Sequence, residues 1–385
     1  MPPRGLEPSL DARPWEGCPA SPQGLPRETG QTTKNREGIR IMDGLNWWGE
    51  GPAGETSTDL ECDPQGRPQG TALQRTLKTT IGCTGVGLHS GKPVSLTLRP
   101  AAPGTGLVFR RLDLPENAAR ELPVSAGKVT DSRLCTTLSN DAGVSLSTIE
   151  HLMAALAALA IDNLLIDVDG PELPIMDGSA QPFLFLIDCA GIQAQAAPRR
   201  ALRVLKPVSV GDGSAQASLM PAERGLTISF EIAFQAAAIG RQSCRFMMTE
   251  SIFRRHVARA RTFGLREDVD RLHAAGLALG GSLENAVVVD GATVLNEDGL
   301  RYEEEFVRHK ALDAIGDLYM AGLPLIGRYH GTRASHHLNN QLLRTLLADP
   351  TAWRLEAVRE AELGLTDVSP FQARREPDAV LRACA

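Results

Sequence analysis

The feature that most constrains this fold is a run of ten apolar residues from Leu152 to Ile161. At the helical period such a run is apolar on every face, so a helix formed by it has no side that water can cover. It is too short to cross a bilayer, which takes about 20 residues. The sequence therefore predicts a buried helix over residues 148–160, enclosed by other elements of a layered fold.

Composition narrows the class of protein. The 385 residues, 42% of them hydrophobic, are enough for two ordinary domains. A net charge of −6 gives no electrostatic support for binding nucleic acid, so no nucleic-acid partner is expected. Seven cysteines, none at CxxC spacing, indicate free thiols in a reducing cytoplasm. With no signal-peptide pattern and no transmembrane run, we expect a soluble protein that holds any lipid-like substrate in a pocket.

Residues 1–72 differ in composition from the rest of the chain. Of these 72 residues, 21 are proline or glycine, and no helical or strand period is sustained among them. Such a composition is typical of disordered segments. We expect either a disordered tail or a stretch upstream of the true start, with Met42 as the alternative start. Trp47 and Trp48 leave open a short interaction motif.

Beyond this tail the pattern is that of a mixed α+β protein. Val94, Leu96 and Leu98 alternate with polar residues, which predicts a strand. Helices are predicted over 148–160, about 178–190, 249–258, 302–321 and 338–348, and strands over 164–168, 201–210, 215–221, 226–234 and 286–290. Residues 193–200 have the pattern of a linker, and residues 265–300 that of an insertion. Each half has strands followed by helices, so we expect two stacked α+β layers.

Glu150 and His151 stand at the start of the predicted buried helix. Ser147 followed three residues later by Glu150 is a capping-box pattern, which explains Glu150 as a helix cap. A charge at the rim of a buried helix also needs a partner such as a metal ion, which makes the pair a functional candidate. The residues alone leave both interpretations open.

The helix predicted over 302–321 carries a polar stripe. His309, Asp313 and Asp317 lie on a face separate from the apolar one. Residues four apart on a helix are neighbours, so His309 and Asp313 can bind one ion together. Such a pair in isolation is more often a solvated polar face, and a third ligand is needed; His151 is the natural candidate. Two histidines and one carboxylate leave one tetrahedral position for water, the pattern of catalytic zinc sites.

His336 and His337 precede the helix predicted over 338–348. Adjacent histidines point in different directions, so at most one of them faces a site. Taken alone, either histidine is explained as a surface residue.

Several motifs, taken in order, resemble the UDP-3-O-acyl-N-acetylglucosamine deacetylases, zinc-dependent enzymes of lipid A synthesis in Gram-negative bacteria. They are QRTL (74–77), TGVGLHSG (84–91), STIEHL (147–152), PIMDGS (174–179), ARTFG (260–264), LNEDGLR (295–301), FVRHK (306–310), LDAIGD (312–317) and LNN (338–340). Each motif is weak alone, but together they cover about residues 74–350 and are specific.

This resemblance implies a fold of class α+β with two domains. Each domain is a β-sheet layer packed on helices, and together they form a β-α-α-β sandwich with the site between the domains. The expected domains are a first domain (73–199) and a second domain (200–363) with its insertion at about 265–300. A disordered N-terminal tail (1–72), which falls outside the family pattern, and a mobile C-terminal tail (364–385) are expected on either side. A cytoplasmic monomer is expected.

The resemblance also implies roles, position by position. Three residues match the zinc ligands, with one zinc ion per chain: His151, His309 and Asp313. Four match catalytic positions: Glu150 as general base, His336 (three residues before Asn339) as the catalytic histidine, Asp317 as its partner and Thr262 as the hydroxyl that steadies the oxyanion. Three match positions near a UDP-linked acylated amino sugar: Lys310, Phe263 and His89. The implied reaction hydrolyses the N-acetyl group to acetate and a free amine.

The insertion and the alternatives complete the expectations. Apolar residues of the insertion predict a passage for the acyl chain, with ordinary packing as the alternative: Leu272, Leu277, Leu279, Val287 and Val289. Either zinc or iron fits the ligand set. A hydrolase for a different N-acyl sugar stays open, as does a catalytically silent binding protein. The silent protein would call for the loss of Glu150 or of a ligand, and neither is lost.

Overall fold

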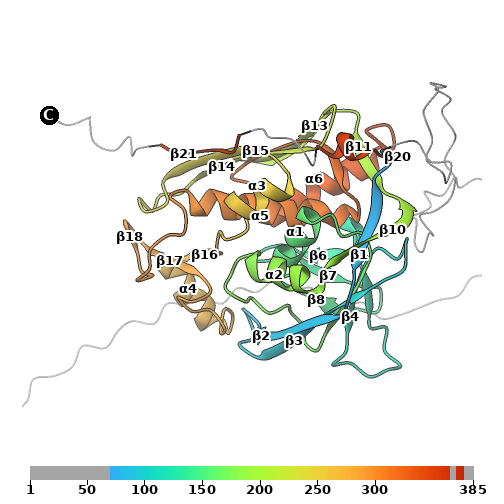
Figure 1. The fold of residues 1–385 in the computed structure, drawn as a ribbon. Coiled ribbons are helices and arrows are strands. Elements are labelled where there is room, and N and C mark those ends of the chain that lie inside the picture. Colours follow the sequence, from blue (N-terminus) through green and yellow to red (C-terminus); the bar gives the residue numbers. More distant parts are fainter. Residues whose placement is uncertain (1–69, 365–369, 377–385) are drawn as a thin grey trace, which may run out of the picture. The chain divides into compact units, whose positions relative to one another are not determined.

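The computed structural model of the chain describes residues 70–364 and 370–376 (Figure 1). The α+β class is confirmed, because these residues form six α-helices and five β-sheets. None of the helices in these ranges is long and apolar enough to span a membrane. The predicted N-terminal tail lies outside the described residues up to position 69.

The helices begin and end close to where the apolar periodicity places them. Their bounds are α1 Glu150–Ala158, α2 Gln181–Ala190, α3 Glu250–His256, α4 Arg266–Ala274, α5 Glu305–Leu318 and α6 His336–Ala348. Three short 3₁₀ turns accompany them: η1 Ala126–Lys128, η2 Tyr319–Ala321 and η3 Glu360–Leu363. The helix predicted over 302–321 is therefore α5 continued by η2.

The first half of the chain contributes a five-stranded sheet in the order β2-β3-β9-β4-β5. Its strands are β2 Ile81–Val86, β3 Pro93–Pro100, β9 Leu164–Val168, β4 Leu107–Arg111 and β5 Glu121–Pro123. The predicted alternation in β3 is confirmed, because Val94, Leu96 and Leu98 are all buried. A smaller antiparallel sheet lies beside it in sequence: β6 Val129–Asp131, β7 Thr137–Ser139 and β8 Ser145–Leu146.

The second half contributes an eight-stranded sheet, with the path β12-β13-β19-β14-β15-β21 and with β11 joining β19 to β20. Its strands are β11 Arg200–Val204, β12 Val208–Asp212, β13 Ala215–Met220, β14 Leu226–Ala233, β15 Arg241–Met247, β19 Leu325–Thr332, β20 Trp353–Ala357 and β21 Gln372–Arg375. The strand predicted over 201–210 is thus two strands. β21 lies within the predicted mobile C-terminal tail, yet it pairs with β15.

The predicted linker over 193–200 is wrong. Residues Ile192–Pro198 form β10, which pairs antiparallel with β1 (Leu73–Leu77). Its alanines and glutamines give no strong alternation of hydrophobicity, but backbone pairing does not require one. The side chain of Gln195 also donates to the carbonyl of Ala101 and accepts from Asn163, which ties the strand to the first half.

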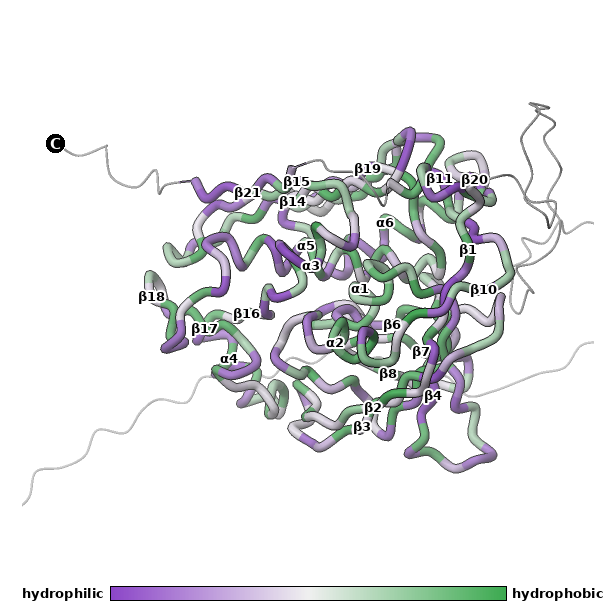
Figure 2. The backbone as a smooth tube through the Cα atoms, viewed as in Figure 1, coloured by the Kyte–Doolittle hydropathy of each residue, from purple (hydrophilic) through white to green (hydrophobic). Residues whose placement is uncertain are grey.

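The buried helix α1 lies against α5 and α2, and α5 in turn contacts β14 and β15 (Figure 1). In Figure 2, α1 and α2 are drawn mainly in the green and white of apolar and neutral residues. Gly316 permits the close approach of α1 to α5, because a Cβ at that position would lie 2.1 Å from the backbone oxygen of Glu150. One hydrophobic cluster runs through residues of both halves, and the division into two domains stays a prediction.

The insertion has a sheet of its own. It comprises β16 (Phe263–Leu265), β17 (Val287–Asp290) and β18 (Thr293–Val294), with α4 between β16 and β17. Gly178 (φ +79°) lies against it so closely that a Cβ there would meet the carbonyl oxygen of Asn285 at 1.9 Å. Residue 285 of the insertion therefore lies directly against the first half of the chain.

Candidate active site

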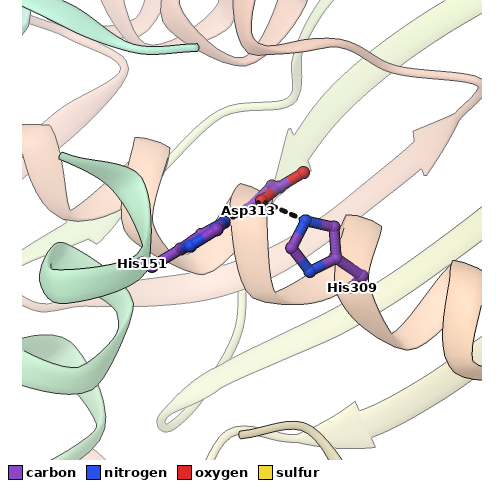
Figure 3. A group of neighbouring side chains, drawn as sticks. All are labelled: His151, His309 and Asp313. Carbon is purple, nitrogen blue, oxygen red and sulfur yellow. Dashed lines mark ion pairs between the residues drawn. The ribbon is translucent and has the colours of Figure 1, made fainter. Parts of the chain in front are cut away.

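Three side chains predicted to bind metal lie together between α1 and α5 (Figure 3). His151 comes from α1, and His309 and Asp313 come from α5. The Oδ1 atom of Asp313 lies 3.3 Å from Nε2 of His309 and 3.6 Å from Nε2 of His151. One ligand atom from each residue lies within 4.8 Å of the others, so the three could hold a metal ion. All three are buried, which excludes the alternative of a solvated polar face.

The hydrogen bonds of Asp313 fit a bound cation. Its Oδ2 accepts from Nζ of Lys310 at 2.6 Å, but its Oδ1 is buried and has no hydrogen-bond partner. Burial raises the pKa of this carboxyl, but His309 and Lys310 outweigh it and hold the pKa well below its usual range. Buried polar atoms in native proteins nearly always have a partner. A charged oxygen without one, flanked by two imidazole nitrogens, is a donor set suited to zinc.

The ring of His309 is held in the form that a metal ligand needs. Its Nδ1 donates to the carbonyl oxygen of Ala260 at 3.0 Å, which leaves the lone pair on Nε2 facing Asp313. Burial lowers the pKa of His309 to about 3, so the ring is neutral. A neutral imidazole with a fixed tautomer is the ligand form of histidine.

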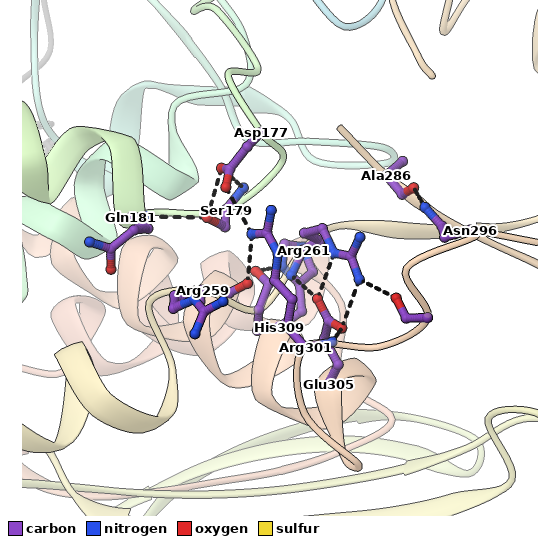
Figure 4. A network of polar contacts seen from close by, with 12 residues as sticks. Asp177, Ser179, Gln181, Arg259, Arg261, Ala286, Asn296, Arg301, Glu305 and His309 are labelled. Carbon is purple, nitrogen blue, oxygen red and sulfur yellow. Dashed lines mark hydrogen bonds and ion pairs between the residues drawn. The ribbon is translucent and has the colours of Figure 1, made fainter. Parts of the chain in front are cut away.

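The segment that carries Ala260 is fixed by a buried ion pair (Figure 4). Glu305, the first residue of α5, accepts from the backbone amide and the guanidinium of Arg261 and from the backbone amide of Arg301. The residue after Arg261 is Thr262, whose amide donates to the carbonyl of Gly178 at 2.8 Å. The pair therefore holds both the partner of His309 and the predicted oxyanion residue.

Glu150 does not cap its helix, so the capping-box interpretation is wrong. The N-cap position of α1 is Ile149, with no side-chain cap bond, and Thr148 before it has φ 59°, a value that β-branched residues rarely adopt. Instead, Oε2 of Glu150 accepts from the backbone amide of Thr136 at 3.1 Å. Burial raises the pKa of Glu150, and His336 and His151 offset this only in part. A carboxyl with a raised pKa is suited to accept a proton.

His336, at the start of α6, is bound to Asp317 on α5. Its Nδ1 lies 2.9 Å from Oδ2 and 3.1 Å from Oδ1 of Asp317. Burial lowers the pKa of His336, but Asp317 outweighs it and raises the pKa to about 9. His336 is therefore protonated at neutral pH and can donate a proton. His337 is exposed, so the structure places only the first of the two histidines in the site.

These residues surround one cavity of about 110 Å³. Its lining includes most of the predicted site residues: Glu150, His151, Thr262, Phe263, His309, Lys310, Asp313 and His336. Asp317 lies behind His336 instead of lining the cavity. His89 is not brought into the lining either, although its neighbour Leu88 is. The ring nitrogens of His89 are buried without partners, and its backbone amide donates to Glu172.

Sequence analysis missed two residues, Thr136 and Tyr329, that fix the positions of Glu150, Asp317 and Asn339. Thr136 binds Glu150 and Asp317, while Tyr329 binds Asn339, which in turn donates to Asp317. Asn339 lies in the LNN motif, so the sequence did mark it as a candidate site residue. Neither Thr136 nor Tyr329 belongs to a motif or to a polar stripe, because their contacts are made between distant parts of the chain.

A proton acceptor and a proton donor that face one cavity beside a candidate metal site are the parts of a hydrolytic active site. Comparison with known proteins gives the particular family. Residues 74–348 match the family model described as UDP-3-O-acyl N-acetylglycosamine deacetylase. The chain belongs to this family, as the resemblance predicted.

Individual relatives align with this chain over nearly their whole length. The UDP-3-O-acyl-N-acetylglucosamine deacetylase of Vibrio parahaemolyticus is 50% identical over 310 residues, which are 80% of this chain and 99% of the relative. The protein of the same name from Shewanella frigidimarina is 49% identical over 301 residues, covering 77% and 97% of the two chains. That of Vibrio cholerae is 49% identical over 310 residues, covering 80% and 99%.

Proposed function

We propose that the chain hydrolyses the N-acetyl group of a UDP-3-O-(3-hydroxyacyl)-N-acetylglucosamine, the committed step of lipid A synthesis in a Gram-negative cytoplasm. The observation that carries the proposal is the unpaired Oδ1 of Asp313 between two imidazole nitrogens, in the same cavity as Glu150 and His336. Family membership supplies the substrate class. The described cysteines carry no disulfide, which agrees with a reducing compartment.

His151, His309 and Asp313 would hold one zinc ion. Bound there, zinc would supply a Lewis acid that lowers the pKa of a water molecule toward about 7. Glu150 would accept the proton of the attacking water, since its raised pKa makes it a stronger base than an exposed carboxylate. The hydroxyl of Thr262, which lines the cavity, would donate to the oxyanion that forms on the acetyl group.

The final step concerns the leaving amine. When the C–N bond breaks, the sugar nitrogen needs a proton, and His336 would donate it from the ring that Asp317 keeps protonated. The products are acetate and the free amine. Lys310, whose ammonium reaches into the cavity beside Asp313, is placed to bind a polar group of the sugar.

We further propose that the two halves form the sheet–helix–helix–sheet sandwich of the family, with this cavity between them. Contact of α1 with α5, of α2 with β2 and of α5 with β14 supports this arrangement. The apolar passage is proposed beside Leu88, which lines the cavity. The insertion reaches this point, because the amides of Leu279 and Gly280 donate to the carbonyls of His89 and Leu88, and the side chain of Leu279 is exposed. Val287 and Val289 are buried in the core, so they support the insertion instead of lining a passage.

The test is acetate release from this substrate by the full chain, with Glu150→Gln beside the parent. A general base predicts a fall in kcat of at least about 100-fold. Glu250→Gln is the matched control, because Glu250 is likewise the first residue of its helix but lies on the exposed α3. If the parent releases acetate and Glu150→Gln does so at a similar rate, the proposed mechanism is contradicted. If the parent itself shows no turnover, the proposed function is contradicted. Substrates with shorter acyl chains should have a lower kcat/KM. A kcat/KM that does not depend on acyl-chain length would contradict the proposed passage.

A further inference from the structure

We infer that Thr136 is a positioning residue that holds the proton acceptor and the partner of the proton donor in one fixed geometry. The inference deepens the proposed function and rests on it. Thr136 is buried, with 2% of its surface exposed, and does not line the cavity. It acts through Glu150 and Asp317, not by contact with substrate.

Two atoms of Thr136 make the connection. Its backbone amide donates to Oε2 of Glu150 at 3.1 Å, and its hydroxyl donates to Oδ1 of Asp317 at 2.6 Å. Glu150 belongs to α1 and Asp317 to α5, so one residue from a third segment spans the carboxylates of two helices. Hydrogen bonds to charged groups are about twice as strong as neutral ones, and both of these bonds are of that kind.

The hydrogen bond from the backbone amide of Thr136 fixes the orientation of the Glu150 carboxylate. No other donor to this carboxylate occurs in the described ranges, so the Thr136 amide alone determines which of its two oxygens is engaged. Oε1 is left to meet a water molecule. A base held in one rotamer is worth more to the reaction than one that rotates, because the reacting atoms are already aligned.

The hydrogen bond from the hydroxyl of Thr136 fixes the orientation of the Asp317 carboxylate. Its two oxygens both face Nδ1 of His336, and the rotation of the carboxylate is set from either side. Thr136 donates to Oδ1, and Asn339 donates to Oδ2 at 2.8 Å. Loss of the Thr136 hydroxyl would leave Asp317 held from one side only, and the ring of His336 would lose its defined direction toward the substrate.

The local fold makes Thr136 rigid. It lies one residue before β7, which pairs with β8, and β8 leads directly into residues 147–149 and then α1. The hydroxyls of Thr137 and Ser147 are 3.0 Å apart and join the two strands. The hairpin that carries Thr136 therefore also leads into the start of α1, where Glu150 lies.

Thr76 provides a matched control. It is also a buried threonine, 4% exposed, and its hydroxyl donates to the carbonyl of Asn163 at 2.7 Å, away from the cavity. Valine at either position keeps the shape of the side chain. At Thr136 it removes the hydroxyl hydrogen bond to Asp317, and at Thr76 it removes the hydrogen bond to Asn163 and the one accepted from the amide of Ala101 at 3.1 Å. Only the bond of Thr136 ends on a residue of the proposed machinery.

The experiment compares Thr136→Val, Thr136→Ser and Thr76→Val in the full chain with zinc at one per chain. We expect Thr136→Val to lower kcat by roughly tenfold to a hundredfold with KM within about twofold, the size of a lost bond to a charged group. Thr136→Ser should recover most of this loss. Thr76→Val removes two hydrogen bonds and should lower the Tm at least as much as Thr136→Val, but it should leave kcat within about twofold.

The double variant Thr136→Val with Asp317→Asn tests the route of the effect. If Thr136 acts through Asp317, its substitution should add little once Asp317 is neutral. Equal kcat losses at Thr136 and Thr76, or full additivity with Asp317→Asn, would overturn the inference. Thr136→Ala replaces the valine variant if that does not fold, and unfolding of both would assign the hydroxyl to stability and overturn the inference. A parent without turnover would instead refute the proposed function.

Discussion

Two buried charged clusters lie about two turns apart on α5, and they differ in how completely their polar atoms are paired. Glu305 begins the helix, is fully buried, and accepts from Arg261 through three N–H groups and from the amide of Arg301. Asp313 is also buried, but its Oδ1 accepts from nothing. The same helix thus carries one carboxylate with all its partners and one with a partner missing.

The difference teaches how to separate scaffolding from function in a protein interior. A buried ion pair with every hydrogen bond made is complete within the chain, and it fixes the segment that carries Ala260 and Thr262. A buried carboxylate with an unpaired oxygen costs free energy until something else binds it. The complete cluster should therefore matter for stability, and the incomplete one for ligand binding and turnover.

The largest expected effect comes from removing the incomplete carboxylate. Since loss of an outer partner of a metal ligand already costs about 10–100-fold in metal affinity, Asp313→Ala should lower zinc affinity and turnover by more than about 100-fold. Zinc per chain is measured by elemental analysis, with Asp188→Ala, an exposed aspartate of α2, as control. Full zinc occupancy and turnover in Asp313→Ala would show that the incompletely paired carboxylate does not bind the metal.

Next in size is the loss of the complete pair. Glu305→Gln leaves the guanidinium of Arg261 buried and uncompensated, which should lower the free energy of unfolding by about 3–5 kcal/mol. Arg254→Gln breaks a partly exposed pair with Asp188 and should cost at most about 1 kcal/mol. Urea unfolding measures both. Similar small costs for the two variants would show that the Glu305 cluster is not scaffolding.

A smaller effect is expected where the two helices meet. Gly316→Ala would place a methyl group 2.1 Å from the backbone oxygen of Glu150, so α1 must shift away from α5. Overpacking of this kind should cost about 1–3 kcal/mol and lower kcat as Glu150 moves. In Gly127→Ala, the added Cβ meets nothing closer than 3.7 Å, so no comparable change is expected. An unchanged Tm and kcat in Gly316→Ala would contradict the tight approach.

The smallest expected effect is a shift in pH dependence. His336 must be protonated to donate, so activity should fall as pH rises through its pKa of about 9. In Asp317→Asn the charge that raises this pKa is gone while burial, which lowers it, remains. The alkaline fall in kcat/KM should therefore move to lower pH by about one to two units. Asp141→Asn, an exposed aspartate, should leave the profile in place, and an unmoved alkaline limb in Asp317→Asn would contradict the role of the pair.

Sequence reasoning placed the helices and the cluster on them because both follow from periodicity. The apolar run predicted α1, and the spacing of His309 and Asp313 put them on one face of α5. The pairing of β10 with β1 was missed, since its alternation is between glutamine and alanine, and alanine is depleted in strands, so the hydrophobic signal is weak. Thr136 was missed for a related reason: its partners lie on two helices, and one of its bonds comes from the backbone amide, which every residue possesses.

The unpaired oxygen of Asp313 marks the proposed zinc site. Anomalous X-ray diffraction at the zinc edge, on crystals of the full chain grown with stoichiometric zinc, tests this most directly. We predict one peak per chain, about 2.0–2.2 Å from Nε2 of His151, Nε2 of His309 and an oxygen of Asp313. A chain that binds no zinc, or a peak that lies away from these three atoms, would contradict the account.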